Sequence, residues 1–137
     1  MENNGGKISF NFVEISRFYD TKDVFLVKGQ SGVWSVKVSE IKLIMADIQY
    51  TKIVLIDNKT FTMRVPLNEW ESKLPSEIFK RVHKSTIVNF SFVESHFSNQ
   101  SKHFLKIEDW EGTIEISRRK QKLITNQNPR DIRPILG

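Results

Sequence analysis

The fold of this 137-residue chain is decided by residues 74–89, which read Leu74-Pro75-Ser76-Glu77-Ile78-Phe79-Lys80-Arg81-Val82-His83-Lys84-Ser85-Thr86-Ile87-Val88-Asn89. Residues 78–82 and 86–93 are rich in the β-branched and aromatic types that strands favour. The residues that join these two runs are basic and polar. The stretch therefore predicts two strands connected by a positively charged turn.

Most of the remaining chain also has the pattern of strands. Short apolar runs are separated by Gly, Asn, Asp and Ser, which are the residues of turns. The predicted strands are residues 24–27, 33–38, 41–45, 52–56, 61–65, 78–82, 86–93, 103–107 and 113–116. Two of them flank Asp57-Asn58-Lys59, which predicts a hairpin turn. The sequence therefore favours a mainly β domain.

One segment has helical spacing instead. Leu67, Trp70 and Leu74 recur at i, i+3 and i+7, the spacing of one helix face. Pro66 precedes this face and Pro75 follows it, which suits a helix start and a helix stop. We expect a single short amphipathic helix anchored by Trp70.

The chain divides into three parts. Residues 1–21 form an N-terminal extension that we expect to be partly disordered, with a candidate strand over Ile8–Phe12 where apolar and polar residues alternate. Residues 22–125 form one domain. Residues 126–137 carry Asn-Pro and Arg-Pro pairs without periodicity, which indicates a flexible tail.

Composition excludes several classes of function. The chain has no cysteine and only three histidines, so a thiolate metal site, a disulfide framework and a cysteine nucleophile are excluded. It has no Gly-rich phosphate loop and no His–carboxylate pair at short range, so we expect no enzyme, no catalytic residues, no metal and no cofactor. No apolar run is long enough for a membrane span or signal peptide, which predicts a cytoplasmic protein.

The basic residues are concentrated in two segments. The 21 Lys and Arg residues exceed the 16 Asp and Glu residues, giving a net charge of +5. Seven of the 21 lie in two acid-free clusters, residues 80–84 and 118–122. Such clusters are ordinarily solvated loops, but they also suit a DNA-binding surface, where cations neutralise phosphates and Arg forks read guanine. Ser117 is a candidate N-cap in front of the second cluster.

Residues 74–89 resemble the central signature of the LytTR DNA-binding domain, a family of bacterial transcription regulators. The shared pattern is Leu-Pro, then Phe-x-Arg-x-His-Lys-Ser, then Val-Asn. Three further segments resemble the family in order and spacing: residues 38–46 its opening strand, Tyr50-Thr51 its first turn, and Ile114-Glu115-Ile116-Ser117-Arg118-Arg119 its closing motif. The resemblance covers residues 22–125.

The resemblance implies an elongated arrangement of antiparallel sheets with one short helix. It also implies that loops between strands, not a recognition helix, enter successive major grooves. The implied candidates for base contacts are Gln49, Tyr50, Lys84, Arg118 and Arg119. The candidates for backbone contacts are Lys52, Lys80, Arg81, His83, Ser85 and Lys120. Two alternatives stay open: His83 could bond within the fold, and Tyr50 could pack on the sheet.

The expected function is sequence-specific binding of double-stranded DNA by a transcription regulator. Two copies on repeated half-sites are expected because one small module buries little surface, and Ile8–Phe12 could add a strand to a second copy. RNA polymerase is a further candidate partner. The alternative is a protein-interaction module that keeps the fold and sequesters another regulator. Family members often carry a receiver domain that 21 residues cannot hold, so the chain is either a free-standing regulator or a fragment.

Overall fold

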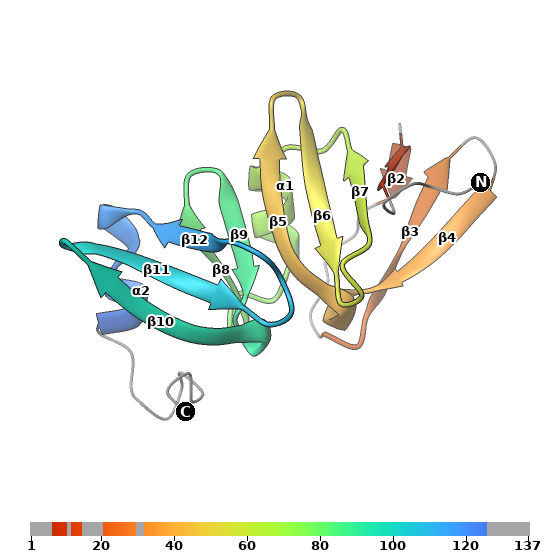
Figure 1. Ribbon diagram of the computed structural model, residues 1–137. Coiled ribbons are helices and arrows are strands. Elements are labelled where there is room, and N and C mark those ends of the chain that lie inside the picture. Colours follow the sequence, from red (N-terminus) through yellow and green to blue (C-terminus); the bar gives the residue numbers. More distant parts are fainter. Residues whose placement is uncertain (1–6, 11, 15–20, 30–31, 126–137) are drawn as a thin grey trace.

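Twelve strands form three sheets in the computed structural model of the protein, which describes residues 7–10, 12–14, 21–29 and 32–125 (Figure 1). The central sheet has six strands, in the order β1-β7-β6-β5-β9-β8. Their bounds are Lys7–Phe10 (β1), Thr60–Met63 (β7), Tyr50–Leu55 (β6), Ile41–Asp47 (β5), Thr86–Asn89 (β9) and Phe79–His83 (β8). Neighbouring strands are antiparallel except β1 and β7, which run parallel.

Two three-stranded antiparallel sheets flank the central sheet. One contains β2 (Phe12–Glu14), β3 (Val24–Gly29) and β4 (Gly32–Lys37). The other contains β10 (Val93–Asn99), β11 (Lys102–Ile107) and β12 (Thr113–Ile116). The three sheets lie in a row in Figure 1, with the six-stranded sheet in the middle. This arrangement confirms the expected mainly β, elongated, multi-sheet architecture.

The predicted helix is α1, Leu67–Lys73, which begins directly after Pro66. Trp70 is fully buried, its Nε1 donates a 3.0 Å hydrogen bond to Thr51 Oγ1, and its ring meets Phe25 edge-on at 5.3 Å. The expectation that Trp70 anchors the helix is confirmed. A four-residue helix, α2 (Lys122–Thr125), ends the described chain. None of the helices in the described ranges has the length and apolar character needed to cross a membrane.

The two faces of the central sheet belong to two separate cores. Successive strand residues point to opposite faces, so Leu43 and Ile44 on β5 enter different cores. On one face, Ile44 and Ile53 pack with Trp70 of α1 and with β3 and β4. On the other face, the second core joins β5, β6, β8 and β9 to the β10–β12 sheet. The flanking sheet that carries the second basic cluster is therefore held against the central sheet by apolar burial.

A buried lysine adds a polar tie between these two sheets. Lys42 is only 2% exposed, and its Nζ donates to Asn58 Oδ1 at 3.0 Å and to the carbonyl of Glu108 at 2.6 Å. Asn58 in turn donates to the carbonyl of Asp109 at 2.5 Å. The central sheet and the turn between β11 and β12 are thus joined by hydrogen bonds that satisfy a buried ammonium group.

The prediction of one strand over residues 86–93 is wrong, because the strand that begins at Thr86 is shorter. β9 ends at Asn89, whose side chain donates to the Ile41 carbonyl at 2.9 Å and accepts from the Ser91 amide at 2.8 Å. The chain then turns through a 3-10 helix, Phe90–Phe92, and enters β10, a strand that the sequence analysis did not predict. A second 3-10 helix, Val38–Glu40, ends the strand predicted over residues 33–38 one residue early.

The N-terminal segment forms two strands where the sequence predicted one. β1 pairs with β7 and β2 pairs with β3, so they belong to two different sheets. β1, which contains Ile8–Phe10 of the strand expected to extend a second copy, pairs with β7 on one side and is an edge strand of the central sheet. Partial disorder was expected within residues 1–21, of which residues 1–6, 11 and 15–20 lie outside the described residues, as does the tail of residues 126–137 that was expected to be flexible.

Candidate nucleic-acid interface

Three connections meet along one edge of the central sheet: the β5–β6 turn, the β8–β9 turn and the segment after β12. The Ala46 amide donates to the Ser85 carbonyl at 2.8 Å, which places the first two side by side. The Ser117 amide donates to the Val82 carbonyl at 2.8 Å, which fixes the third beside the second. Antiparallel pairing of β5 with both β6 and β9 explains why the two turns share this edge.

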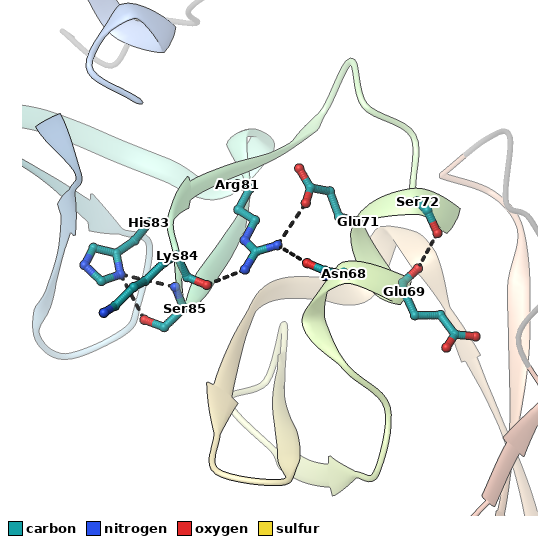
Figure 2. A network of polar contacts seen from close by, with 8 residues as sticks. All are labelled: Asn68, Glu69, Glu71, Ser72, Arg81, His83, Lys84 and Ser85. Atoms are coloured by element: carbon teal, nitrogen blue, oxygen red, sulfur yellow. Dashed lines mark hydrogen bonds and ion pairs between the residues drawn. The ribbon is translucent and has the colours of Figure 1, made fainter. Parts of the chain in front are cut away.

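The β8–β9 turn consists of Lys84 and Ser85, and Figure 2 shows its polar contacts. His83 Nδ1 accepts from the Ser85 amide at 3.2 Å and lies 3.0 Å from Ser85 Oγ. Because Nδ1 is the acceptor, the neutral ring carries its proton on Nε2. The alternative that His83 bonds within the fold is therefore confirmed for one of its nitrogens. The Lys84 side chain is exposed.

Arg81 extends from β8 toward helix α1, on the face opposite Lys80. Its Nη1 donates to Asn68 Oδ1 at 2.6 Å and to Glu71 Oε1 at 3.0 Å, both on the helix. Its Nη2 donates to the Lys84 carbonyl. Figure 2 shows the guanidinium group between the helix and the turn. Arg81 is a candidate for contact with the DNA backbone, but its Nη1 and Nη2 groups are already bonded within the protein.

The segment after β12 is a 3-10 helix, Arg118–Lys120, which begins after Ser117. The expectation that Ser117 caps it holds for position only, since its hydroxyl makes no capping hydrogen bond. Arg118 and Arg119 are exposed and Lys120 is half-buried. The Lys120 amide donates to the Ser117 carbonyl at 2.9 Å, which is the i to i+3 hydrogen bond of this 3-10 turn.

A cleft of about 380 Å³ brings the two basic clusters together. Its lining residues are Glu71, Arg81, His83, Lys84, Ser117, Arg119 and Lys120. Arg119 faces the cleft whereas its neighbour Arg118 is not among the lining residues. Glu71 is the single carboxylate among these lining residues, and it is bonded to Arg81. The cleft therefore carries an excess of positive charge suited to an anionic ligand.

The β5–β6 turn presents the third group of candidates. Gln49 is exposed, and Ile48 before it has a positive φ of 55° and is 96% exposed. Tyr50 is half-buried, and its hydroxyl accepts from Arg64 Nη2 at 3.2 Å. The Arg64 guanidinium carbon lies 5.3 Å from the centre of the Tyr50 ring, a cation–π contact. The hydrogen bond to the Tyr50 hydroxyl raises the pKa of Arg64 above its usual value.

Arg64 is a candidate that the sequence analysis missed. It follows β7, and because Thr51 pairs with Met63, the antiparallel register sets Arg64 beside Tyr50. Counting back from the turn predicted at residues 57–59 would pair Arg64 with Lys52, whereas the observed register pairs Val54 with Thr60, so the hairpin signal alone did not place Arg64 beside Tyr50. The other two backbone candidates, Lys52 and Lys80, are half-buried on β6 and β8 and do not line the cleft.

The remaining two histidines lie on the β10–β12 sheet, where His103 pairs with Ile116, directly before Ser117. His96 Nε2 and His103 Nδ1 are 2.8 Å apart, and the two rings stack at 5.1 Å. Partial burial, and secondarily the charge of His103, lower the pKa of His96 below its usual value. Within the described ranges, no group of three or more His, Asp or Glu side chains is placed to hold a metal ion.

A β domain that carries basic loops along one sheet edge, with an arginine and a lysine in a shared cleft, defines a nucleic-acid-binding module. Residues 31–127 match the family model of the LytTr DNA-binding domain. The chain therefore belongs to the LytTR family of DNA-binding domains, as residues 74–89 indicated.

A solved structure agrees with this assignment at the level of the fold. It is the LytTr DNA-binding domain of a Bacillus cereus protein that is described as a methyl-accepting/DNA response regulator. The similarity has a TM-score of 0.66 at 24% sequence identity and covers 77% of this chain and 95% of that chain. Among curated proteins, the sequence finds no significant match.

Proposed function

We propose that this protein is a transcription regulator that binds specific double-stranded DNA sequences through its three edge loops. The observation that carries the proposal is the cleft shared by Lys84 and Arg119, two side chains of the types that reach guanine O6 and N7. A B-DNA major groove is about 12 Å wide and admits a two-stranded β-ribbon. A narrow hairpin such as β8–β9 suits that opening.

Each candidate then has a role that follows from its position. Lys84, Arg119 and Arg118 contact bases from the second and third loops, and Gln49 and Tyr50 from the first. The contacts to the DNA backbone come from Lys52, Lys80, His83, Ser85 and Lys120. Two copies bind repeated half-sites about one helical turn apart, roughly 10 base pairs, because a single small module buries limited surface. As a transcription regulator in the cytoplasm, the DNA-bound protein would also contact RNA polymerase.

DNA binding measured as a function of salt is the direct test. Duplexes selected from a random library are compared with scrambled duplexes of equal composition, by fluorescence anisotropy between about 50 and 200 mM salt. We expect binding to both at low salt, a slope of log affinity against log salt near −0.9 per phosphate contact, and preference for the selected duplex.

Two results would contradict the proposal in different ways. Equal affinity for selected and scrambled duplexes removes sequence specificity and leaves only general attraction to phosphates. No binding at low salt removes DNA binding altogether, and supports the alternative that this fold sequesters another regulator. Sedimentation of the complex on one and on two half-sites tests the proposed pair of copies, which requires twice the bound mass on the longer duplex.

A further inference from the structure

The guanidinium group of Arg81 connects helix α1 with the β8–β9 turn. It donates to Asn68 and Glu71 on the helix, at 2.6 and 3.0 Å, and to the Lys84 carbonyl in the turn (Figure 2). The Arg81 side chain is 19% exposed, whereas the neighbouring Lys84 is exposed to solvent. Both terminal nitrogens of Arg81 therefore donate hydrogen bonds within the protein.

The Arg81 guanidinium reaches the turn where the strand pairing is irregular. The register of β8 against β9 shifts between Arg81 and His83, as in a β-bulge. Lys84 and Ser85 lie in the hairpin tip, beyond the paired residues His83 and Thr86. The Lys84 carbonyl receives its hydrogen bond from the Arg81 side chain instead.

Helix α1 is a rigid support for this contact. Its other face is buried through Leu67 and Trp70, so Asn68 and Glu71 are held in place by the first core. The planar fork of an arginine can bond both helix acceptors and the turn carbonyl at once, which the ammonium group of a lysine cannot do with the same geometry. Glu71 also neutralises the charge of Arg81 within the cleft.

We propose that Arg81 is a positioning residue that holds the Lys84–Ser85 turn in its DNA-reading conformation through its bonds to helix α1, and is not a phosphate contact. The inference rests on the proposed function and refines the role that the sequence suggested for this residue. It assigns to α1 a part in specificity that acts through Arg81 and requires no contact between the helix and a base.

The variants Arg81→Lys and Arg81→Gln separate the two roles. A positioning residue requires the fork, so both variants lower affinity for the selected duplex by roughly 5- to 150-fold, the cost of one lost base contact. Affinity for scrambled duplexes and the salt slope stay unchanged. A phosphate contact requires only charge: Arg81→Lys would then retain affinity, and Arg81→Gln would reduce the slope by about 0.9 on every duplex. That pattern would overturn the proposal.

Two helix variants form a matched pair that leaves Arg81 in place. Glu71→Ala removes a partner of Arg81, and Glu69→Ala removes the same charge from an exposed position two residues away on the same helix. We expect Glu71→Ala to reduce the ratio of specific to non-specific affinity and Glu69→Ala to leave it unchanged. Equal ratios in both variants contradict a role for the helix, and the test stands even where Arg81 variants fold poorly.

The free protein provides a readout that does not depend on DNA. Arg81→Lys is expected to shift the amide resonances of Lys84 and Ser85 and to increase the hydrogen exchange of this turn, while the amides of β10–β12 stay unchanged. An unaltered turn contradicts positioning, whatever the DNA result. Failure of wild-type DNA binding together with a disturbed turn in Arg81→Lys would contradict the proposed function alone.

Discussion

The amide of Ser117 donates a 2.8 Å hydrogen bond to the carbonyl of Val82, and this contact joins the two basic segments of the chain. Val82 lies between Arg81 and His83 on β8, and Ser117 directly precedes Arg118 and Arg119. Because both atoms belong to the backbone, the distance between the segments does not depend on side-chain conformations. The cleft that contains Lys84 and Arg119 is a consequence of this pairing.

Arg119 is expected to contribute more to sequence-specific binding than Arg118, since only Arg119 lines the cleft. Arg119→Ala should cost about 1–3 kcal/mol on a selected duplex and relax preference at one base position. Arg118→Ala serves as the matched control and should cost less. Binding to a panel of single-base variants of the duplex measures both effects. A larger loss for Arg118→Ala, or uniform weakening across the panel for Arg119→Ala, contradicts this assignment.

Arg64 is expected to contact a DNA phosphate beside the first loop. Its side chain is exposed, and its guanidinium lies over the Tyr50 ring at the edge that carries the three loops. Arg64→Gln should reduce the salt slope by about 0.9 on selected and scrambled duplexes alike. The control is Lys59→Gln, which removes a charge from the turn at the opposite end of the β6–β7 hairpin. Equal slopes for the two variants would exclude Arg64 from the interface.

Lys42 is expected to stabilise the fold through its bonds to Asn58 and the Glu108 carbonyl. Lys42→Met keeps the apolar stem but leaves these acceptors without a donor, which should cost about 1–3 kcal/mol in free energy of unfolding. Urea denaturation measures the loss. Lys37→Met, at an exposed position on β4, should stay within about 0.5 kcal/mol of wild type. An unchanged midpoint in Lys42→Met would show that water replaces the lost donor.

The His96–His103 pair is expected to make folding sensitive to acid. The folded state lowers the pKa of His96, so the unfolded chain binds the proton more readily. Above the ordinary histidine pKa, this group makes its full contribution to the free energy of unfolding. The contribution is lost as the pH falls below the ordinary pKa and then through the lowered pKa of His96 in the folded state. Urea denaturation at a series of pH values from about 7.5 to 5 measures the decline.

His96→Gln should show a smaller decline than wild type over the same pH range, because no proton can bind at that position. Asn99→Ala changes an exposed residue of the same strand and should keep the wild-type profile. A His96→Gln profile that parallels wild type would mean that the acid sensitivity comes from other groups.

Local patterns were sufficient where local forces decide the structure. Pro66 and Pro75 delimit the helix, and Leu67, Trp70 and Leu74 are all buried as their spacing predicted. The end of the strand at Asn89 was missed, although an asparagine after a strand-like run often closes a turn. Its neighbours on both sides favour strands, and β9 ends there because the Asn89 side chain bonds the carbonyl of Ile41, far away in the sequence.

The same division applies to the candidate site. Both basic clusters were visible in the sequence, but their members proved unequal once packing was known. Arg119 lines the cleft and Arg118 does not, while Arg81 is bonded to α1 and to the turn. Arg64 lay outside both clusters and reaches the same edge through strand register.

The sequence by itself determined the β-rich composition, the single amphipathic helix, the LytTR family and the two segments that carry the charge. These properties depend on residue types and on spacings within a few positions, which act locally through backbone preference and side-chain alternation. Only the tertiary structure decided which basic residues share a cleft and which are bonded internally. Those outcomes depend on contacts such as Val82 with Ser117 and Arg81 with Glu71, formed when sheets and helix bury their apolar faces together.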